Sequence, residues 1–438
     1  MGRRRTLFAL VAGVAVALAT AVVGAPDGVA AAAVVCSAPA WAEGNTYPAG
    51  TQVTYGGKLY SALVTHTAYA GAGWNPAATP SLWRDLGACT GGPTTPPPTT
   101  TPPPSTPPPT TPPPTTPPPG GTCAVKSRPA GKVLVGYWEN WDGASNGVHP
   151  GLGWVPITDS RLRQHGYNVI NAAFPVIRSD GTVLWENGMD AGVQVSTPAE
   201  MCAAKASGAT LLMSIGGAAA GIDLSSSAVA DRFVATVVPI LRQYNFDGID
   251  IDIETGLTGS GSITTLSASQ ANLIRIIDGV LAQMPSNFGL TMAPETAYVT
   301  GGSVTYGSIW GAYLPIIKKY ADNGRLWWLN MQYYNGSMYG CAGDSYGAGT
   351  VQGFVAQTTC LNTGLVIQGT TIRVPYDKQV PGLPAQSGAG GGYMAPSLVS
   401  QSWNSFNGGL KGLMTWSANW DGSRSWTFGD NVKNLQGR

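Results

Sequence analysis

Residues 123–438 alternate short apolar runs, rich in strand-forming residues, with longer stretches in which apolar residues recur at helical spacing. The expected strands are residues 133–138, 168–174, 210–215, 246–254, 289–293, 326–333, 379–384 and 410–416. Helices are expected between them, for example at residues 229–244, 267–284, 309–322 and 396–406. This alternation predicts an α/β fold, a (β/α)₈ TIM barrel whose active site lies at the C-terminal ends of the strands. An open doubly wound sheet is the alternative, but no glycine-rich phosphate-binding pattern follows the first strand.

The fourth expected strand carries an unusual run of acids, DGIDIDIE at residues 247–254. Successive side chains of a strand point to opposite faces, so Asp250, Asp252 and Glu254 share one face and isoleucines occupy the other. Such carboxylates lie about 6–7 Å apart, repel one another when ionised and lose solvation when enclosed. At least one should therefore hold a proton with a raised pKa, as a general acid requires at neutral pH. A Ca²⁺ or Mg²⁺ site is one alternative, but its ligands would need loop-like spacing. The solvent-exposed face of an edge strand is another, but the isoleucines on the opposite face argue against an edge strand.

Aromatic and amide side chains stand near the ends of other expected strands: Tyr137, Trp138, Phe174, Gln332, Tyr334, Asn335 and Trp416. Because the C-terminal ends of barrel strands meet at one rim, we expect these residues to surround the acids. Asp247 is out of phase with the acidic face, so we interpret it as structural. His66, His149 and His165 suggest no catalytic triad.

Composition narrows the class of ligand. The 438 residues include 24 Lys and Arg against 23 Asp and Glu, a formal net charge of +1, and no basic blocks. Nucleic acid is therefore not an expected partner. Few charges and many Gly, Trp and Tyr residues suit a polar, uncharged ligand such as a sugar. No cofactor is expected, and nothing in the pattern suggests other than a monomer.

The N-terminal region has the features of an export signal. Three arginines at residues 3–5 precede an apolar run at residues 7–23 and small residues at 29–33. We interpret residues 1–33 as a signal peptide, with a transmembrane anchor as the alternative. Small residues rather than stop-transfer charges follow the run, and no later segment is apolar enough to span a bilayer. We therefore expect a secreted, extracellular protein that has no membrane partner.

Six cysteines suit an oxidising compartment. A TTPPP-type repeat within residues 90–122 cannot bury a core and should form an extended spacer of roughly 80 Å. This linker isolates Cys36 and Cys89 in a small N-terminal unit, so these two should pair with each other. The other expected pairs are Cys341 with Cys360 and, by elimination, Cys123 with Cys202. None of the spacings resembles a zinc site, and no metal is expected.

The small unit at residues 36–89 is dense in aromatic residues. Its residues 51–55 and 58–64 flank Gly56 and Gly57, which is a hairpin signal. A unit of this size cannot bury all of its aromatics, so some should face solvent as a platform for sugar rings. These aromatics are Trp41, Tyr47, Tyr55, Tyr60, Tyr69, Trp74 and Trp83.

The motifs of this unit resemble the small chitin-binding modules of carbohydrate-binding families 5 and 12. The matching segments are AW at 40–41, YPAG at 47–50, VTY at 53–55, GKLY at 57–60, HT at 66–67, WNP at 74–76 and LW at 82–83. The resemblance implies an all-β chitin-binding domain in which Trp74 is the exposed binding residue. We interpret Trp41 and Trp83 as core.

The barrel region resembles glycoside hydrolase family 18, the chitinase family, in the form of a secreted bacterial enzyme. DGIDIDIE matches the family signature DGxDxDxE at every defined position. Further matches are SIGG at 214–217, MAPE at 292–295, MQYYN at 331–335, Trp416, and WD at 420–421. They occur in the expected order along residues 123–438, which we take as the catalytic domain.

The resemblance implies a role for each matching residue. Glu254 would be the general acid and later the base, while Asp252 would orient the 2-acetamido group of the substrate. Asp250 would share a proton with Asp252 and tune it, and Tyr334 would donate a hydrogen bond to the acetamido oxygen. The acetamido group would itself attack the anomeric carbon, which gives retention of configuration. Further substrate-binding or supporting residues would be Trp416 as the floor, Gln332, Asn335, Tyr137, Met292 and Ser214.

Taken together, the patterns predict a secreted, endo-acting chitinase with chitin and chito-oligosaccharides as partners. The resemblance also implies endo-cleavage: some family members carry a small domain after the seventh strand that deepens the cleft, whereas here only about 25 residues separate 384 from 410, room for a single helix. A chitin-binding lectin is one alternative, but such relatives usually lack the catalytic glutamate. An endo-β-N-acetylglucosaminidase acting on N-glycans is another, and the attached chitin-binding module argues against it. Peptidoglycan is a weaker candidate substrate.

Overall fold

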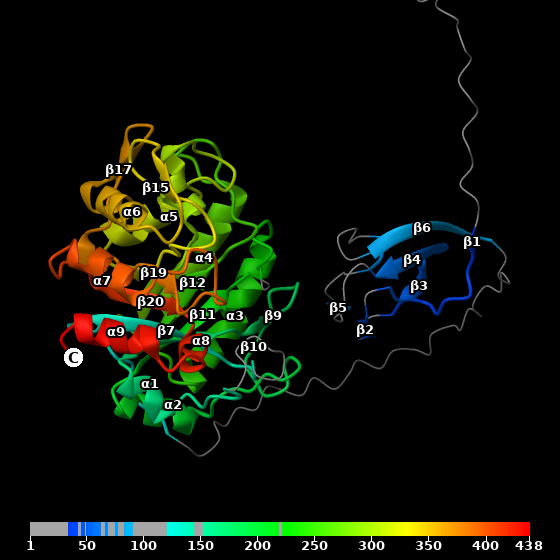
Figure 1. The fold of residues 1–438 in the computed structure, drawn as a ribbon, viewed down its shortest axis with the longest axis horizontal. Helices are drawn as coiled ribbons and strands as arrows, with labels where there is room; N and C mark the ends of the chain where they lie inside the picture. The colour runs from blue at the N-terminus through cyan, green and yellow to red at the C-terminus, as the bar shows by residue number, and fades with distance from the viewer. Residues whose placement is uncertain are drawn as a thin grey trace, which may run out of the picture. The chain divides into compact units, whose positions relative to one another are not determined.

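The computed structural model describes residues 34–42, 45–48, 50–62, 66–68, 75–77, 83–90, 121–143, 152–218 and 221–438. The chain divides into two compact units, Met1–Thr110 and Thr111–Arg438. Figure 1 shows a small all-β unit and a larger unit in which helices surround strands. The two units are described separately below.

The larger unit is built on eight parallel strands. They are β7 (Val133–Glu139), β8 (Val169–Ala173), β11 (Thr210–Gly216), β12 (Gly248–Asp252), β13 (Gly289–Met292), β14 (Leu326–Leu329), β19 (Gly382–Pro384) and β20 (Gly412–Trp416). Hydrogen bonding runs in the order β14-β13-β12-β11-β8-β7-β20-β19. Parallel bridges from Leu329 to Gln379 and from Gln332 to Gly382 join the two ends of this sheet. The expected (β/α)₈ barrel is therefore confirmed, with every expected strand in place.

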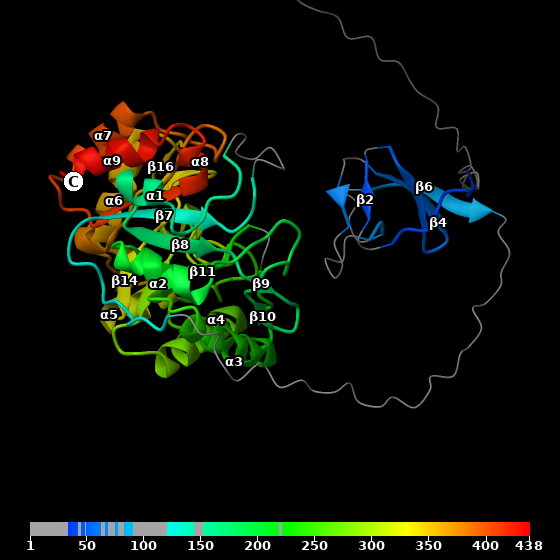
Figure 2. The same cartoon turned by 90° about the horizontal axis from the view of Figure 1, so that it is seen from below.

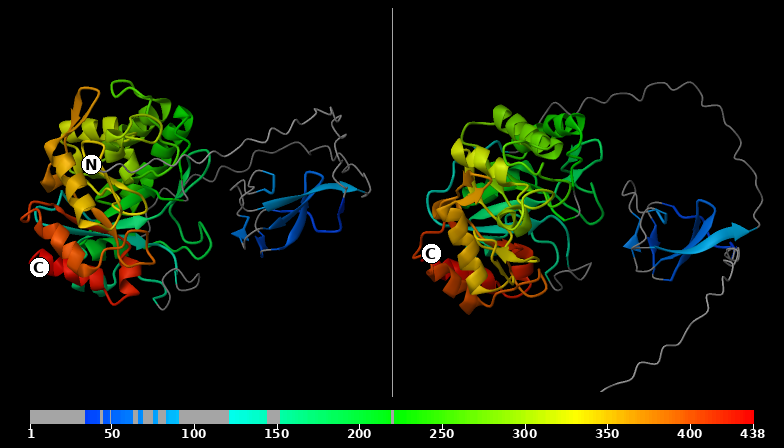
Figure 3. Two further views of the ribbon diagram at one scale, coloured as in Figure 1. Left: turned by 45° about the horizontal axis from the view of Figure 1, so that its top comes forward. Right: turned by 90° about the horizontal axis from the view of Figure 1, so that it is seen from above.

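Helices lie outside the strands, as Figures 2 and 3 show from other directions. The α-helices are α1 (Ser160–Gln164), α2 (Pro198–Ala206), α3 (Ser227–Gln243), α4 (Ala268–Gln283), α5 (Leu314–Asp322), α6 (Val351–Thr363), α7 (Pro396–Asn404), α8 (Ala418–Gly422) and α9 (Thr427–Leu435). Local sequence explains several starts. Ser267 and Gln270 form a capping box at the N-terminus of α4, as Thr197 and Glu200 do at α2. Helix α5 begins five residues later than expected, beside Pro315, a residue favoured in the first turn of a helix.

Shorter elements lie outside the eight barrel strands. The two-stranded pairs are β9 (Val176–Ile177) with β10 (Val183–Leu184), β15 (Met338–Tyr339) with β16 (Ser345–Tyr346), and β17 (Leu365–Ile367) with β18 (Thr370–Ile372). The 3₁₀ turns are η1 (Thr296–Tyr298), η2 (Thr300–Ser303) and η3 (Tyr376–Lys378).

Strand β12 divides its side chains between two environments, as its alternation predicts. Ile249, Ile251 and Ile253 are fully buried in the apolar cluster that also includes residues of the surrounding helices. Asp250 and Asp252 face the barrel interior, where they accept hydrogen bonds from Asn330 and Gln332 on the segment that follows β14. The burial of the isoleucine face fixes the register of β12 and so fixes where its acids point.

Asp247 is structural, as its phase predicts. Its carboxylate is fully buried and forms an ion pair with the Nζ of Lys205 at 2.7 Å. It also accepts hydrogen bonds from the backbone N–H groups of Lys126, at 2.7 Å, and Leu211, at 2.9 Å. These contacts tie the segment before β7 to the N-terminal end of the barrel, away from the acidic face.

The small unit contains a four-stranded sheet in the order β1-β6-β4-β3, formed by Val34–Val35, Trp83–Thr90, Lys58–Ala62 and Gln52–Tyr55. β2 (Thr46–Tyr47) pairs with β5 (His66–Thr67). Gly56 and Gly57 have φ angles of 56° and 75° and form the expected hairpin turn. Trp83 lies in the core as expected, while Trp41 is half-buried and packs edge-on against Tyr55 at 5.3 Å. The expectation for Trp74 falls outside the described residues.

The three expected disulfides are present: Cys36–Cys89, Cys123–Cys202 and Cys341–Cys360. Within the described ranges, no helix is long and apolar enough to cross a membrane.

Candidate active site

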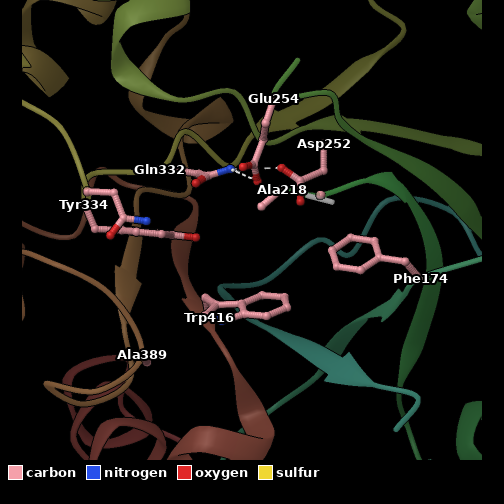
Figure 4. Close-up of a pocket in the computed structure, with 10 residues that line it drawn as sticks. Phe174, Ala218, Asp252, Glu254, Gln332, Tyr334, Ala389 and Trp416 are labelled. Carbon is pink, nitrogen blue, oxygen red and sulfur yellow. Dashed lines mark hydrogen bonds between the residues drawn. The ribbon is translucent and has the colours of Figure 1, made fainter. Parts of the chain in front are cut away.

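A cavity of about 160 Å³ opens at the C-terminal ends of the barrel strands. Figure 4 shows carboxylates on one side of this cavity and the ring of Trp416 on the opposite side. The lining residues come from the C-terminal ends of six strands and the segments that follow them: Phe174, Gly217, Ala218, Asp252, Glu254, Gln332, Tyr334, Asn335, Ala389 and Trp416. Five of the seven residues expected around the acids therefore line the cavity, whereas Tyr137 and Trp138 do not.

Asp250 lies below this cavity and is fully buried. Four side chains donate hydrogen bonds to its carboxylate: Tyr137 at 2.6 Å, Ser214 at 2.9 Å, Thr291 at 2.5 Å and Asn330 at 2.8 Å. Burial raises the pKa of Asp250, and these hydrogen bonds act in the opposite direction. The four donors that converge on Asp250 favour its ionised form beneath the site.

Asp252 and Glu254 are coupled through the side-chain amide of Gln332. Its Nε2 donates to Oδ1 of Asp252 at 2.9 Å and to Oε1 of Glu254 at 3.0 Å (Figure 4). Burial raises the pKa of Asp252 well above its ordinary value, and the charges of Glu254 and Asp250 raise it further. Burial also raises the pKa of Glu254, whereas its hydrogen bonds with Gln332 and Asp252 lower it. The pair therefore retains a proton more readily than isolated carboxyls do, which confirms the expected raised pKa.

Trp416 forms an aromatic floor with its neighbours. Its ring stacks on Phe174 with centroids 5.9 Å apart and an interplanar angle of 18°, and it packs against Tyr137 at 5.5 Å. Trp141, which follows β7, adds a further ring 6.2 Å from Trp416. The ring face of Trp416 that borders the cavity is suited to the apolar face of a sugar.

Tyr334 and Asn335 lie on the segment after β14. The Tyr334 hydroxyl points into the space between the carboxylates and Trp416 (Figure 4). Burial, together with the charge of Asp252, raises the pKa of Tyr334 well above its ordinary value, so it remains a hydrogen-bond donor. Asn335 has a positive φ of 63°, and its Oδ1 accepts a hydrogen bond from the backbone N–H of Gly391 at 2.8 Å. Asn335 thus holds the segment that follows β19 against the cavity.

Two residues expected at the site, Met292 and Trp138, lie elsewhere. Met292 is fully buried in the apolar cluster between the strands and the helices, so its expected role in substrate binding is wrong. The reason is strand alternation: the neighbouring Thr291 faces inward to Asp250, which turns Met292 outward. Trp138 also faces away from the site, and its indole N–H donates to the carbonyl of Val155.

Several residues of the site were not predicted from the motifs. Thr291 and Asn330 supply two of the four donors to Asp250. Tyr298 donates to the backbone carbonyl of Glu254 at 2.8 Å, and Tyr313 donates to that of Ile253 at 2.9 Å. The alternation of side chains along a strand could have predicted that Thr291 and Asn330 point into the barrel. It could not have identified Tyr298 and Tyr313, which lie beyond strand β13. Among the described residues, no group of three or more His, Cys, Asp or Glu side chains could hold a metal ion.

Comparison with known proteins agrees with this geometry. Residues 40–84 match the model for carbohydrate-binding module family 5/12, and residues 133–333 match the model for glycosyl hydrolases family 18. Endochitinase 4 of Metarhizium robertsii is 81% identical over 312 residues, which are 71% of this chain and 90% of that protein. The chain belongs to glycosyl hydrolase family 18.

This family 18 member is also similar to a second fungal protein and to a solved bacterial structure. Endochitinase 37 of Trichoderma harzianum is 81% identical over 310 residues, covering 71% of this chain and 92% of that protein. The crystal structure of a family GH18 chitinase from Chromobacterium violaceum is 29% identical, with a TM-score of 0.61, and covers 92% of this chain and all of that chain. Because the relatives at 81% identity are fungal, the comparisons do not bear out the expected bacterial origin.

Proposed function

We propose that this family 18 enzyme is an endo-acting chitinase that hydrolyses β-1,4 bonds between N-acetylglucosamine units with retention of configuration. The observation that carries the proposal is the arrangement of Asp252 and Glu254 around one amide, facing Trp416 across a cavity that Tyr334 enters. The relatives at 81% identity carry the name endochitinase.

The first step uses the substrate as its own nucleophile. The sugar on the non-reducing side of the scissile bond lies on Trp416, with its 2-acetamido group between Asp252 and Tyr334. Glu254 gives its proton to the glycosidic oxygen as the bond from that oxygen to the anomeric carbon breaks. The acetamido carbonyl oxygen forms the new bond to the anomeric carbon and produces a cyclic oxazolinium ion. Asp252 accepts the acetamido N–H, and Tyr334 donates to the acetamido oxygen.

The second step returns the enzyme to its starting state. Glu254, now ionised, takes a proton from water, and the resulting hydroxide attacks the anomeric carbon. The bond to the acetamido oxygen breaks, and the acetamido group is restored. Because each step inverts the anomeric carbon, the product keeps the β configuration.

The effects that raise and lower the pKa values of the three acids explain how Asp252 and Glu254 share one proton. The four hydrogen bonds that Asp250 accepts favour its ionised form against the effect of burial, and its charge raises the pKa of Asp252. Asp252 therefore keeps a proton in the resting pair and shares it with Glu254 through their hydrogen bond. When substrate enters, movement of that proton to Glu254 leaves a negative Asp252 beside the developing positive charge of the oxazolinium.

The remaining parts of the chain fit extracellular action on a solid polymer. We assign residues 1–33 to a signal peptide, 36–89 to the chitin-binding module, 90–122 to a linker and 123–438 to the catalytic domain. The family model matched at residues 40–84 and the three disulfides support these assignments. In the module, Trp74 would contact chitin and raise the local substrate concentration for the tethered catalytic domain.

The decisive experiment is a product time course on a soluble chitin hexasaccharide, with wild type beside Glu254→Gln. The exposed Glu186→Gln is the matched control. Wild type and control should release internal-cleavage products that are initially β-anomers, while Glu254→Gln should be at least about a hundredfold slower. Equal rates for wild type and Glu254→Gln would remove Glu254 from acid catalysis, and an absence of cleavage by wild type would leave chitin binding as the function.

A further inference from the structure

Glu139 and Asn140 lie at the C-terminal end of β7, beside the cavity but outside its lining. Both residues are almost completely buried. Neither has a role in the proposed reaction, yet a buried polar side chain costs free energy unless it is hydrogen-bonded. Strand β7 lies between β8, which Phe174 follows, and β20, which ends at Trp416. The two polar residues therefore stand between the two rings that line the aromatic side of the cavity.

Asn140 holds the backbone that carries Phe174. Its Nδ2 donates to the backbone carbonyl of Phe174 at 2.9 Å, and its backbone N–H donates to the carbonyl of Ala173, also at 2.9 Å. The carbonyl of Asn140 in turn accepts from the N–H of Gln194 at 2.8 Å. One residue thus holds two consecutive carbonyl groups at the end of β8, which restricts rotation of the backbone at Phe174.

Glu139 holds the backbone beside Trp416. Its Oε1 accepts a hydrogen bond from the Oγ of Ser417, and its backbone N–H donates to Oδ1 of Asn419 at 3.0 Å. Ser417 is fully buried and also caps α8, where its Oγ accepts from the backbone N–H of Trp420 at 3.1 Å. Ser417 is therefore fixed between β7 and α8, and the residue before it, Trp416, is fixed with it.

The two sets of contacts act on one stacked pair of rings. Phe174 and Trp416 have centroids 5.9 Å apart and an interplanar angle of 18°, and both line the cavity. The contact of a sugar with such a surface is a sum of many weak attractions that fall steeply with distance. A shift of either strand end would tilt one ring against the other and reduce that sum.

We propose that Glu139 and Asn140 are positioning residues that hold Phe174 and Trp416 in the arrangement on which the sugar under attack binds. The inference rests on the proposed function. Because neither residue lines the cavity, each acts on the substrate only through the aromatic floor. Displacement of a positioning group by about 1 Å can cost about a hundredfold in rate, so a partial displacement should be measurable.

The test is a double-mutant cycle in kcat/KM on the soluble chitin hexasaccharide. Asn140→Leu keeps the approximate volume and removes the donor to Phe174, so it should lower kcat/KM roughly tenfold. In a Trp416→Ala background, where the stacked floor is absent, the same substitution should change kcat/KM by less than about threefold. Equal factors in the two backgrounds would indicate a general structural role and overturn the proposal. Asn140→Ser, which is too short to reach the carbonyl, replaces the leucine variant if that variant does not fold.

Asn272→Leu is the matched control. Asn272, on α4, donates from its Nδ2 to the backbone carbonyl of Leu224 at 2.8 Å and does not line the cavity. Both leucine variants should lower the urea midpoint of unfolding, but Asn272→Leu should keep the wild-type kcat/KM. An equal loss of kcat/KM in the two variants would overturn the role of Asn140.

Glu139 is tested by its conservative variant. Glu139→Gln keeps an oxygen that can accept from Ser417 and should stay within about threefold of wild type, whereas Glu139→Leu should lower kcat/KM roughly tenfold. Ser417→Ala breaks the same contact from the donor side and serves if Glu139→Leu does not fold. A wild-type kcat/KM in the variant that lacks this contact would remove Glu139 from the proposal.

Affinity separates this inference from the proposed function. Calorimetry of the hexasaccharide with Glu254→Gln as the common background keeps the ligand intact, and Asn140→Leu should weaken binding there unless Trp416→Ala is also present. The chitin-binding module is the same in every variant, so a difference between variants reports the barrel cavity. If wild type does not cut the hexasaccharide, the proposed function fails, and this cycle in affinity decides the role of Asn140. Equal affinities with and without Asn140→Leu would then overturn it.

Discussion

The hydroxyl of Tyr137, on the first strand of the barrel, donates a 2.6 Å hydrogen bond to Oδ2 of Asp250 on the fourth. Both side chains are fully buried, so this contact crosses the barrel interior directly beneath the catalytic pair. It lowers the pKa of Asp250 against the opposing effect of burial. The charge of Asp250 in turn raises the pKa of Asp252. A phenol that does not line the cavity thus contributes to proton placement at the reaction centre.

Tyr137→Phe should weaken both stability and catalysis. The substitution leaves a buried carboxylate short of one donor, so the free energy of unfolding should fall by about 1–3 kcal/mol. The pKa of Asp250 should rise, which reduces the negative charge beneath Asp252 and lowers kcat. Urea denaturation and steady-state kinetics measure the two effects. Tyr376→Phe is a suitable control, since that ring packs on Phe406 outside the barrel interior. An unchanged kcat would show that Asp250 does not depend on Tyr137.

Gln332→Met should shift the pH dependence of the reaction. The general acid must be protonated, so activity is present below the pKa of Glu254 and is lost as pH rises through it. The amide of Gln332 lowers the pKa of Glu254, and its removal should raise that pKa. The basic limb of the kcat/KM profile should therefore move to higher pH, while the maximum falls at least about tenfold as the pair loses its shared donor. A limb that moves to lower pH would contradict this coupling.

Asp421 should make the folded state less stable as pH rises. Burial raises its pKa to about 6, although Tyr167 and two backbone N–H groups donate to it. The folded state therefore holds this proton more tightly than the unfolded state, so the stabilisation is complete below the unfolded pKa and is lost as pH rises through about 6. The difference amounts to roughly 2–3 kcal/mol.

The corresponding measurement is the free energy of unfolding of the full chain between about pH 4 and pH 7. Wild type should lose stability more steeply with rising pH than Asp421→Asn does, whatever the absolute stability of the variant. Asp190→Asn, at an exposed position, should keep the wild-type slope. Identical slopes for wild type and Asp421→Asn would mean that Asp421 does not titrate in this range.

Asn335→Gly should raise KM with a smaller effect on kcat. Glycine tolerates the positive φ of 63° but removes the oxygen that accepts from Gly391. The segment after β19 would then be held less firmly at the cavity, and KM should rise roughly threefold to tenfold. Asn407→Gly, at another position of positive φ and away from the cavity lining, is the matched control. A KM unchanged in Asn335→Gly would show that the hydrogen bond to Gly391 does not shape the cavity.

Local patterns along the chain were sufficient to predict the structural features that depend on the periodicity of apolar residues. Alternation in DGIDIDIE placed the isoleucines outward and the acids inward, because burial of an apolar face admits only one register. The order of strand-like and helix-like stretches was enough for the barrel, and the linker was enough to pair Cys36 with Cys89. These features are encoded by neighbours in the sequence.

Only the tertiary structure decided what surrounds each acid. The four donors to Asp250 come from three other strands and from the residue that follows β14. The amide that couples Asp252 with Glu254 belongs to a residue about eighty positions away in the sequence. Met292, within a matching motif, turned outward because Thr291 took the inward position. The physical reason is that burial, hydrogen bonding and pKa depend on groups brought together across the barrel, and sequence spacing carries little information about those distances.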